Sequence, residues 1–284
     1  MDSEKCRVLL TVISEGTLSK AAEKLGYTVS GISRSISALE DECGFQLIHR
    51  DRNGVKLSSE GQILLPSFQE YAKVSDKLVE SIHAIKGLYS GKVSVGVVYV
   101  NYFRWLTRII SDFREKYPEV EVNVVQGNSS ELTNALLEHK LDFLIGSKRE
   151  GPQAFIPLQT VSMCACVHSS HPMVESGVYP LKLFEIDNLI APYSASETDY
   201  AIALRENQIQ PNIVHVTSDV YSAYSMVEAG LGVSFLNRLE PECWDGDVVL
   251  LPTSPAVYVD IGIAYMNDCL GPSAHELIKA CQKL

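Results

Sequence analysis

The feature of this sequence that most constrains its fold is the stretch of residues 18–39, LSKAAEKLGYTVSGISRSISAL. The small side chains of Ala21 and Ala22 allow a second helix to cross a first one closely, and Gly26 can end that first helix in the left-handed conformation at little cost. Apolar residues then repeat at a helical spacing: Ile32, Ile36 and Leu39. The stretch therefore predicts two short helices joined by a tight turn, which is a helix-turn-helix.

The second helix of this pair has a short and mostly polar outer face. Thr28 is placed to cap that helix, as Thr17 is placed to cap the first one. The residues of the outer face are Val29, Ser30, Ser33, Arg34 and Ser37. Such a face suits contacts with base edges and phosphates, but a plain helical hairpin would show the same pattern. This stretch alone therefore leaves DNA binding and a purely structural role equally open.

A short hairpin is predicted directly after the helix pair. Residues 45–50 form one strand, and Asn53-Gly54 supplies the positive φ angles of a tight turn, so that the chain returns as a second strand. Arg50 and Arg52 lie at the tip, from which they can reach the phosphate backbone or an adjacent minor groove. We interpret the hairpin as a wing, and a solvated basic hairpin is the alternative.

The run from Thr17 to Glu42, TLSKAAEKLGYTVSGISRSISALEDE, resembles the N-terminal signature of LysR-type transcriptional regulators. Residues 44–61, GFQLIHRDRNGVKLSSEG, resemble that family's wing and the start of its linker helix. The resemblance implies a winged helix-turn-helix that binds double-stranded promoter DNA, a long dimerising linker helix, and a two-lobed α/β effector-binding domain resembling periplasmic binding proteins. It also implies a small-molecule effector and a homo-oligomer that is a dimer of dimers.

The resemblance places the second helix in the major groove and the wing arginines Arg50 and Arg52 against the DNA backbone. The residues expected to face the bases are Val29, Ser30, Ser33 and Arg34. Val29 departs from the family pattern, because members usually carry a polar residue such as Gln at this position. It is suited instead to contact with a thymine methyl group.

The net charge of −11 is distributed unevenly along the chain. Residues 1–91 hold 11 Lys and Arg against 12 Asp and Glu, whereas residues 92–284 hold 13 against 23. The basic residues around the second helix and the wing are Arg34, Arg50, Arg52 and Lys56. Overall acidity therefore argues against non-specific coating of nucleic acid but leaves a local basic face intact.

The cysteine content and the hydropathy pattern bear on the compartment. Seven cysteines, an odd number without a framework spacing, are typical of a reducing environment. The sequence contains no charged-then-apolar N-terminal segment and no uninterrupted apolar stretch of about 18 residues. We therefore expect a soluble, cytoplasmic protein with no membrane partner.

A single long helix is predicted to begin at a capping box formed by Ser59 and Gln62 and to end near residue 86. Apolar residues recur every three or four positions on one side: Leu64, Phe68, Tyr71, Val74, Leu78, Ile82 and Ile85. The helix spans roughly 40 Å at about 1.5 Å per residue, which is more than a small core requires. We therefore expect the stripe to pack on the same helix of a second chain, with a kink at Pro66 and a hinge at the glycines that follow the helix.

From residue 92 the pattern changes to alternating strands and helices, which predicts an open and mostly parallel α/β sheet. Residues 162–169 are interpreted as a strand that crosses into a second lobe, and residues 259–267 as the return strand. The predicted domains are a winged helix-turn-helix at 1–61, a linker helix and hinge at 62–91, and an effector-binding domain at 92–284. Within the last, lobe I covers about 92–162 and 266–284, and lobe II covers about 163–265.

Ligands of such sheets bind in loops beyond the carboxyl ends of the strands, here in the cleft between the two lobes. The candidate effector-binding residues in these loops are Tyr99, Val100, Asn101, Ser129, Ser130, Ser147, Tyr193, Thr217 and Ser218. Hydroxyl and backbone groups at helix N-termini suit a small anion. Tyr99 and Val100 stand where the family commonly has a serine or threonine, a departure that argues against an anionic effector and for a more apolar or aromatic ligand.

The sequence lacks the patterns of catalysis and of metal binding. It contains no G-x-S-x-G, phosphate-loop or H-E-x-x-H motif, so we expect no enzyme, no cofactor and no metal. Cys164 and Cys166 lie in the apolar run MCACV and are interpreted as buried packing, and His168 and His171 as parts of a turn. The alternatives are a regulator that senses redox state through cysteine, or a small-molecule-binding protein without a DNA function.

Overall fold

The computed structural model describes residues 2–51, 54–86, 89–194, 197–239, 245–268 and 270–282. The chain divides into two compact units, Met1–Tyr89 with Asp268–Pro272, and Ser90–Asn267 with Ser273–Leu284. Most of the expected linker region 62–91 is grouped with the first unit, so the helix-turn-helix and the long helix form one compact body. The functional division at residues 61 and 91 stays a prediction.

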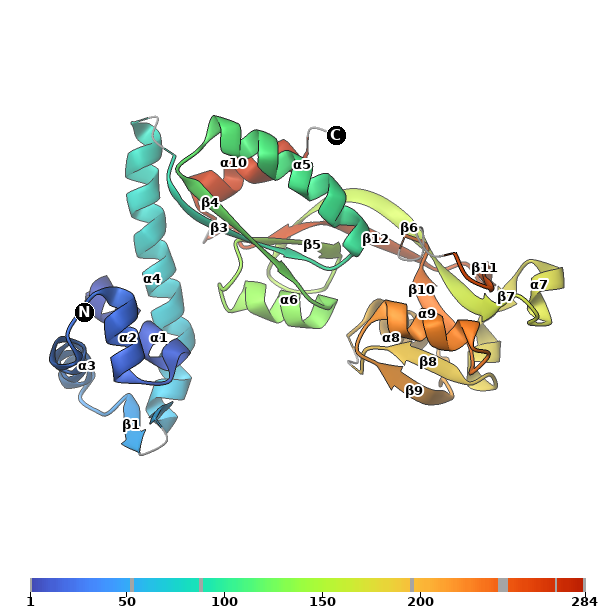
Figure 1. Cartoon of the computed structure of the whole chain (residues 1–284), viewed down its shortest axis with the longest axis horizontal. Helices are drawn as coiled ribbons and strands as arrows, with labels where there is room; N and C mark the ends of the chain where they lie inside the picture. The colour runs from blue at the N-terminus through green and yellow to red at the C-terminus, as the bar shows by residue number, and fades with distance from the viewer. Residues whose placement is uncertain are drawn as a thin grey trace. The chain divides into compact units, whose positions relative to one another are not determined.

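The first unit contains the predicted helix-turn-helix and hairpin (Figure 1). Its elements are α1 (Ser3–Glu15), α2 (Leu18–Leu25), α3 (Val29–Cys43), β1 (Ile48–Asp51), β2 (Gly54–Leu57) and α4 (Ser59–Ile85). The first three helices bury the expected apolar residues, among them Ala21 and Ile32, in one core. Gly26 ends α2 with φ at 69°, a left-handed conformation that glycine adopts without a Cβ clash.

The long helix α4 begins one residue earlier than predicted. Its N-cap is Ser58 rather than Ser59, because the Ser58 hydroxyl accepts from the Gly61 amide at 2.9 Å and donates to the Gln46 carbonyl at 2.7 Å. A side chain on Gly61 would place a Cβ 2.2 Å from the carbonyl oxygen of Leu47. The expected capping box is therefore wrong, because a contact with the preceding loop selects the other serine.

The apolar stripe of α4 has two parts. Phe68 is buried and Leu64 partly buried against the core of the first unit. The rest of the stripe is exposed in the single chain: Tyr71, Val74, Leu78, Ile82 and Ile85. The expectation that the whole stripe faces a second chain is thus wrong for its first two members, which the helix-turn-helix itself covers. Pro66 lies inside α4, which is continuous from Ser59 to Ile85.

The second unit begins with a sheet of strand order β4-β3-β5-β12-β6. Its strands are β3 (Gly91–Val97), β4 (Val120–Gln126), β5 (Phe143–Ser147), β6 (Ala154–His168) and β12 (Tyr258–Tyr265). Helices α5 (Val100–Lys116) and α10 (Pro272–Cys281) lie over one face and α6 (Ser129–Leu137) over the other (Figure 1). Leu144 of β5 packs against α6, as the alternation of side chains along a strand requires.

The second lobe is built on the C-terminal half of β6, residues 163–168. Its strands are β7 (Tyr179–Pro180), β8 (Leu189–Pro192), β9 (Ile213–Thr217), β10 (Ser234–Asn237) and β11 (Val248–Ser254). Its helices are α7 (Met173–Ser176), the 3-10 helix η1 (Leu181–Glu185), α8 (Asp199–Glu206) and α9 (Val220–Glu228). The strands β10 and β11 both pair antiparallel with β6, and β8 pairs parallel with β9.

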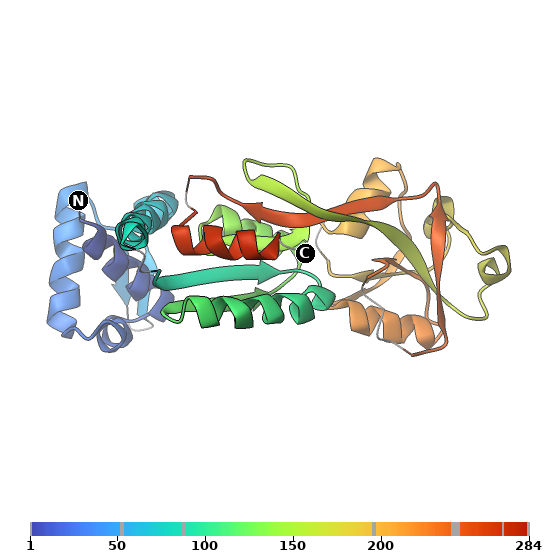
Figure 2. The same cartoon turned by 90° about the horizontal axis from the view of Figure 1, so that it is seen from above.

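The two lobes share the strands β6 and β12, which run side by side between them (Figure 2). These strands carry the chain out and back, so they are antiparallel, and β12 is also antiparallel to β5. The predicted mostly parallel sheet is therefore wrong, and the sheet is mixed. Residues 258–265 pair with β6 and, from Ile261 on, also with β5, and the predicted lobe boundaries at residues 162, 163 and 266 stay predictions. Among the helices described, none combines the length and the apolarity needed to span a bilayer.

Candidate functional site

The outer face of α3 is held at a defined angle by caps and by the core. The Thr17 hydroxyl accepts from the Lys20 amide at 3.3 Å, and the Thr28 hydroxyl accepts from the Gly31 amide at 3.1 Å, so both threonines are N-caps as predicted. Val29, Ser30 and Arg34 are exposed, and Ser33 is half-buried. The fold thus brings the predicted reading residues together on one accessible helical surface.

The wing is bound to both helices of the helix-turn-helix. Arg50 on β1 donates from Nη1 to the Ser33 hydroxyl of α3 at 3.0 Å. On the other strand, the Val55 amide donates to the Gly16 carbonyl at 2.8 Å, next to the start of α2. Arg50 is therefore oriented toward the exposed face of α3. Arg52 lies outside the described residues.

Two further residues shape this surface, and neither was predicted from the sequence. The Glu40 carboxylate of α3 accepts from the amides of Leu47 and Ile48 at 2.8 and 3.2 Å, which fixes the loop before the wing. Tyr27 is exposed beside Thr28, and its hydroxyl donates to Glu4 at 3.1 Å. That hydrogen bond raises the pKa of Tyr27. An aromatic residue in the turn was the available signal for Tyr27.

In the second unit, the loops of the two lobes meet around a cavity of about 40 Å³. Three predicted effector residues line it, namely Tyr99, Ser129 and Tyr193. Its other lining residues include Asn128, Thr198, Asp199, Tyr200, Val220, Phe235 and Asn237. The first residues of α6 and α9 are among them, so the positive ends of helices from both lobes border the cavity. We call this site the cleft.

The six remaining predicted effector residues are not among those that line the cleft. Ser147 hydrogen-bonds the Tyr99 hydroxyl at the edge of the cleft, and the hydroxyl oxygen of Ser130 is buried with no hydrogen-bond partner among the described residues. The other four are Val100, Asn101, Thr217 and Ser218. Thr217 and Ser218 both bond to Asp219, the N-cap of α9. They serve the helix cap, because their side chains are turned toward it.

A hydrogen-bonded group spans the lobes at the cleft, and we call it the cross-lobe network. Its members are Tyr99, Ser147, Arg149 and Asp199. Asp199, the first residue of α8, accepts from the Tyr99 hydroxyl and from Arg149 Nη2, the latter at 2.5 Å. The side chains of Arg149 and Asp199 are 12% and 11% exposed. Neither was predicted, although Arg149 lies two residues after the predicted Ser147, and the helix α8 was not predicted either.

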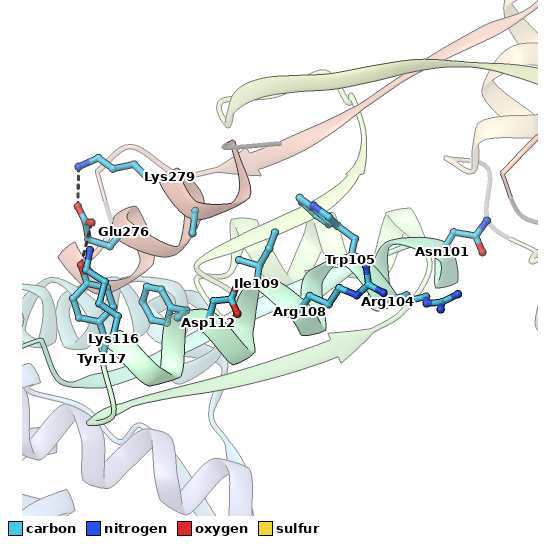
Figure 3. Close-up of a pocket in the computed structure, with 12 residues that line it drawn as sticks. Asn101, Arg104, Trp105, Arg108, Ile109, Asp112, Lys116, Tyr117, Glu276 and Lys279 are labelled. Carbon is cyan, nitrogen blue, oxygen red and sulfur yellow. Dashed lines mark hydrogen bonds and ion pairs between the residues drawn. The ribbon is translucent and has the colours of Figure 1, made fainter.

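A larger cavity of about 670 Å³ lies on the first lobe, between α5 and α10 (Figure 3). Trp105, Arg104 and Arg108 line it from α5. At its other end Glu276 pairs with Lys279 at 2.8 Å and accepts from Tyr117 at 3.3 Å. Of the predicted effector residues only Asn101 borders this cavity. Its open, mainly helical wall lacks the converging loops that the cleft has.

The cysteines and histidines give no support to redox or metal chemistry in the part of the chain that the structure describes. Five cysteines there are free thiols, and burial raises the pKa of Cys166 to about 12 and also raises that of Cys164. A thiol that stays protonated is a poor nucleophile and a poor oxidation target. Among the described residues no group of three or more His, Cys, Asp or Glu side chains could hold a metal ion.

Comparison with known proteins matches both units to described families. Residues 3–62 match the bacterial regulatory helix-turn-helix protein, lysR family, and residues 86–284 match the LysR substrate binding domain. An uncharacterized HTH-type transcriptional regulator of Bacillus subtilis, YvbU, is 26% identical over 271 residues, which cover 93% of this chain and 91% of that protein. BenM of Acinetobacter baylyi is 27% identical over 247 residues, covering 83% and 80%.

Solved structures share the fold along the whole chain. A full-length OxyR variant from Pseudomonas aeruginosa superposes with a TM-score of 0.78 at 20% identity, covering 100% of this chain and 95% of that one. Full-length CbnR complexed with its target DNA superposes with a TM-score of 0.61 at 18% identity, covering 100% and 99%. At these identities the likeness concerns the fold alone.

Proposed function

The chain belongs to the LysR family of bacterial transcriptional regulators, and we propose which of its surfaces this DNA-binding regulator uses for promoter DNA, for its effector and for a second copy of itself. The observation that carries the proposal is the single exposed surface formed by α3 and the wing. Val29, Ser30 and Arg34 on this surface are exposed, whereas Ile32, Ile36 and Leu39 on the opposite face of α3 are fully buried.

On DNA, α3 enters the major groove, and Val29, Ser30, Ser33 and Arg34 face the bases. Arg50 gives up its hydrogen bond to Ser33 and donates to a DNA phosphate instead. Arg52 contacts the DNA backbone as well. The amide groups at the capped ends, next to Thr17 and Thr28, add contacts of the kind that helix N-termini make with phosphates. The Arg50–Ser33 bond supports this arrangement, because it holds the wing and α3 as one surface before DNA binds.

A second copy of the chain covers the exposed part of the α4 stripe. LysR regulators form oligomers, and Leu78 and Ile85, with 62% and 87% of their surface exposed, belong to a continuous exposed apolar stripe of the kind that marks an interface. A two-fold symmetric dimer formed through α4 presents the α3 helices of both chains to half-sites about one helical turn apart, or a multiple of it. Two such dimers then associate as a dimer of dimers.

The effector binds in the cleft rather than in the cavity beside α10. Tyr99, Ser129 and Tyr193 come from both lobes there, so a ligand that binds one arrangement of the lobes more tightly shifts the protein toward that arrangement. Apolar side chains such as Phe235 suit the body of the ligand, and hydroxyl groups suit a polar end. The family consists of regulators, and we propose that the cleft binds its ligand without transforming it, in the cytoplasm where promoter DNA is found.

The test is binding of the purified protein to DNA from upstream of its own gene, compared with scrambled DNA of equal composition over a series of salt concentrations. Selective binding that weakens steeply with salt is expected. Arg34→Ala should weaken binding to the specific site by about 1–3 kcal/mol, roughly 5- to 150-fold, and change binding to scrambled DNA much less. Lys24→Ala is the control, because Lys24 is an exposed lysine of α2 that pairs with Glu15.

Two results would count against the proposal. In the first, the protein binds no DNA recovered by genome-wide selection more tightly than it binds the scrambled DNA. The helix-turn-helix would then have a structural role only. An Arg34→Ala protein that keeps both affinity and selectivity would remove Arg34 from the interface.

A further inference from the structure

One carboxylate of the second lobe reaches across the cleft into a group of donors on the first lobe. Asp199 Oδ2 accepts from the Tyr99 hydroxyl, and the oxygen of that hydroxyl accepts in turn from Ser147. Asp199 Oδ1 accepts from Arg149 Nη2 at 2.5 Å. Tyr99 and Ser147 are buried, and the ion pair is nearly so. The first lobe therefore offers two donors, the Tyr99 hydroxyl and Arg149 Nη2, that converge on one carboxylate.

The guanidinium of Arg149 is only partly used. Its Nη2 bonds Asp199 and its Nη1 bonds the carbonyl of Lys148 at 3.0 Å. Its Nε is buried and has no hydrogen-bond partner among the described residues. Nε and Nη2 form one edge of the guanidinium, the edge that binds a carboxylate through two parallel hydrogen bonds. Asp199 cannot do this, because its second oxygen is turned to Tyr99.

Asp199 also separates two cavities. It lines the cleft of about 40 Å³, and together with Arg149 it lines an open cavity of about 260 Å³ bordered by Tyr258 and Asp260. A volume of 40 Å³ holds little more than water, whereas ligand sites usually measure about 300–1,000 Å³. The closed cleft must therefore open before a ligand enters, and the side chain of Asp199 stands in the wall that has to move.

Opening the wall leaves buried donors without their acceptor. A charged guanidinium and a phenol hydroxyl that lose a buried carboxylate are costly to leave unpaired. A ligand that brings its own carboxylate satisfies them, and it can use Arg149 Nε as well. A neutral or cationic ligand offers no such replacement.

We propose that Asp199 is an internal ligand that occupies, in the closed cleft, the position of the carboxylate of a small organic-acid effector. The effector displaces Asp199 from Tyr99 and Arg149, and α8 with the second lobe moves as its carboxylate leaves. The effector class is thus a compact carboxylic acid whose apolar part lies against the aromatic side of the cleft. This inference rests on the proposed role of the cleft as the effector site.

Chemical rescue tests the proposal with formate and acetate as probes. In full-length Asp199→Ala the donors of the first lobe lose their carboxylate, so the melting temperature should fall. Sodium formate or acetate should then raise it saturably, by roughly 3–10 °C over sodium chloride of equal ionic strength. Wild-type protein should show little difference between the salts, because its own carboxylate fills the site.

Three control variants separate this site from general salt effects. Arg149→Met combined with Asp199→Ala should abolish the rescue. Asp199→Asn should show a weaker rescue than Asp199→Ala, because the amide fills most of the space. Glu197→Ala, which breaks the exposed pair with Arg205, should gain nothing from acetate. Rescue that is absent, that survives loss of Arg149, or that is equal in Glu197→Ala overturns the proposal.

If Asp199→Ala does not fold, hydrogen exchange of Asp199→Asn gives the answer. Acetate should displace the neutral amide and speed exchange in residues 198–206 relative to chloride, and unchanged exchange overturns the proposal. Neither readout depends on DNA. If acetate rescues the variant but the protein does not bind DNA selectively, the carboxylate site stands and the proposed DNA-binding surface is rejected. If the protein binds DNA selectively but acetate does not rescue the variant, only the carboxylate site is rejected.

Discussion

Replacement of Leu78 by alanine should weaken self-association of the full-length protein strongly. Leu78 is 62% exposed in the single chain, at the middle of the exposed part of the α4 stripe. Complete burial of a leucine contributes about 1.5–3 kcal/mol, so covering this exposed fraction contributes roughly 1–2 kcal/mol per chain. A two-fold interface contains the residue twice, which gives about 2–4 kcal/mol and roughly a 30- to 1,000-fold rise in the dimer dissociation constant.

Sedimentation velocity over a dilution series measures this constant. Val79→Ala is the matched control, because Val79 is adjacent on α4 and 48% exposed but points about 100° away from Leu78 around the helix. The circular dichroism of both variants should equal that of the wild type, since neither side chain is in the core of the chain. An Leu78→Ala protein that dissociates at the same concentration as the wild type would refute the assignment of the stripe to a homodimer.

Further predictions concern the wing, a helix cap and the thiols. Arg50→Ala should lower the salt slope of DNA binding by about one and weaken specific and scrambled DNA alike, as loss of one phosphate contact requires; an unchanged slope would contradict that contact. The pKa of Asp219 is lowered mainly by hydrogen bonds from the hydroxyl and amide of Ser222. Its carboxylate should therefore stabilise the fold above about pH 4, and this stability should be lost as the pH falls through the pKa of Asp219 in the folded protein. In urea unfolding at pH 7, Asp219→Ala should lower the free energy of unfolding by about 1 kcal/mol, and Asp219→Asn by less. Cys166 and Cys281, with pKa values raised to about 12 by burial, should be alkylated at pH 7.5 only after unfolding, as peptide mass spectrometry can show; rapid labelling of the native protein would reopen a redox role.

The helix-turn-helix was predictable because its signals are local. Thr17, Thr28 and Gly26 each act on backbone groups within a few residues, so their roles as caps and as a helix end follow from the sequence and agree with the structure. The choice between Ser58 and Ser59 was not predictable in this way. Both precede a helical pattern, and only the contact with the Gln46 carbonyl selects Ser58.

The residues of the candidate effector site also divide into those with a local signal in the sequence and those placed by distant contacts. Tyr99, Ser129 and Tyr193 were found because the ends of strands point to one edge of a sheet whatever the details of packing. Arg149 and Asp199 are 50 residues apart and belong to different lobes, and no periodicity or motif connects them. Their pairing depends on the angle between the lobes, which the crossing strands β6 and β12 set.

By itself the sequence determined the helix-turn-helix, the long helix and the alternation of strands and helices in two lobes, because periodicity, caps and turns act over short distances. Only the tertiary structure decided that Leu64 and Phe68 turn inward while Leu78 stays exposed, since that depends on where the helix-turn-helix ends along α4. It also decided the mixed direction of the sheet and the insertion of Asp199 between Tyr99 and Arg149. These features arise from contacts between distant segments, which local patterns do not encode.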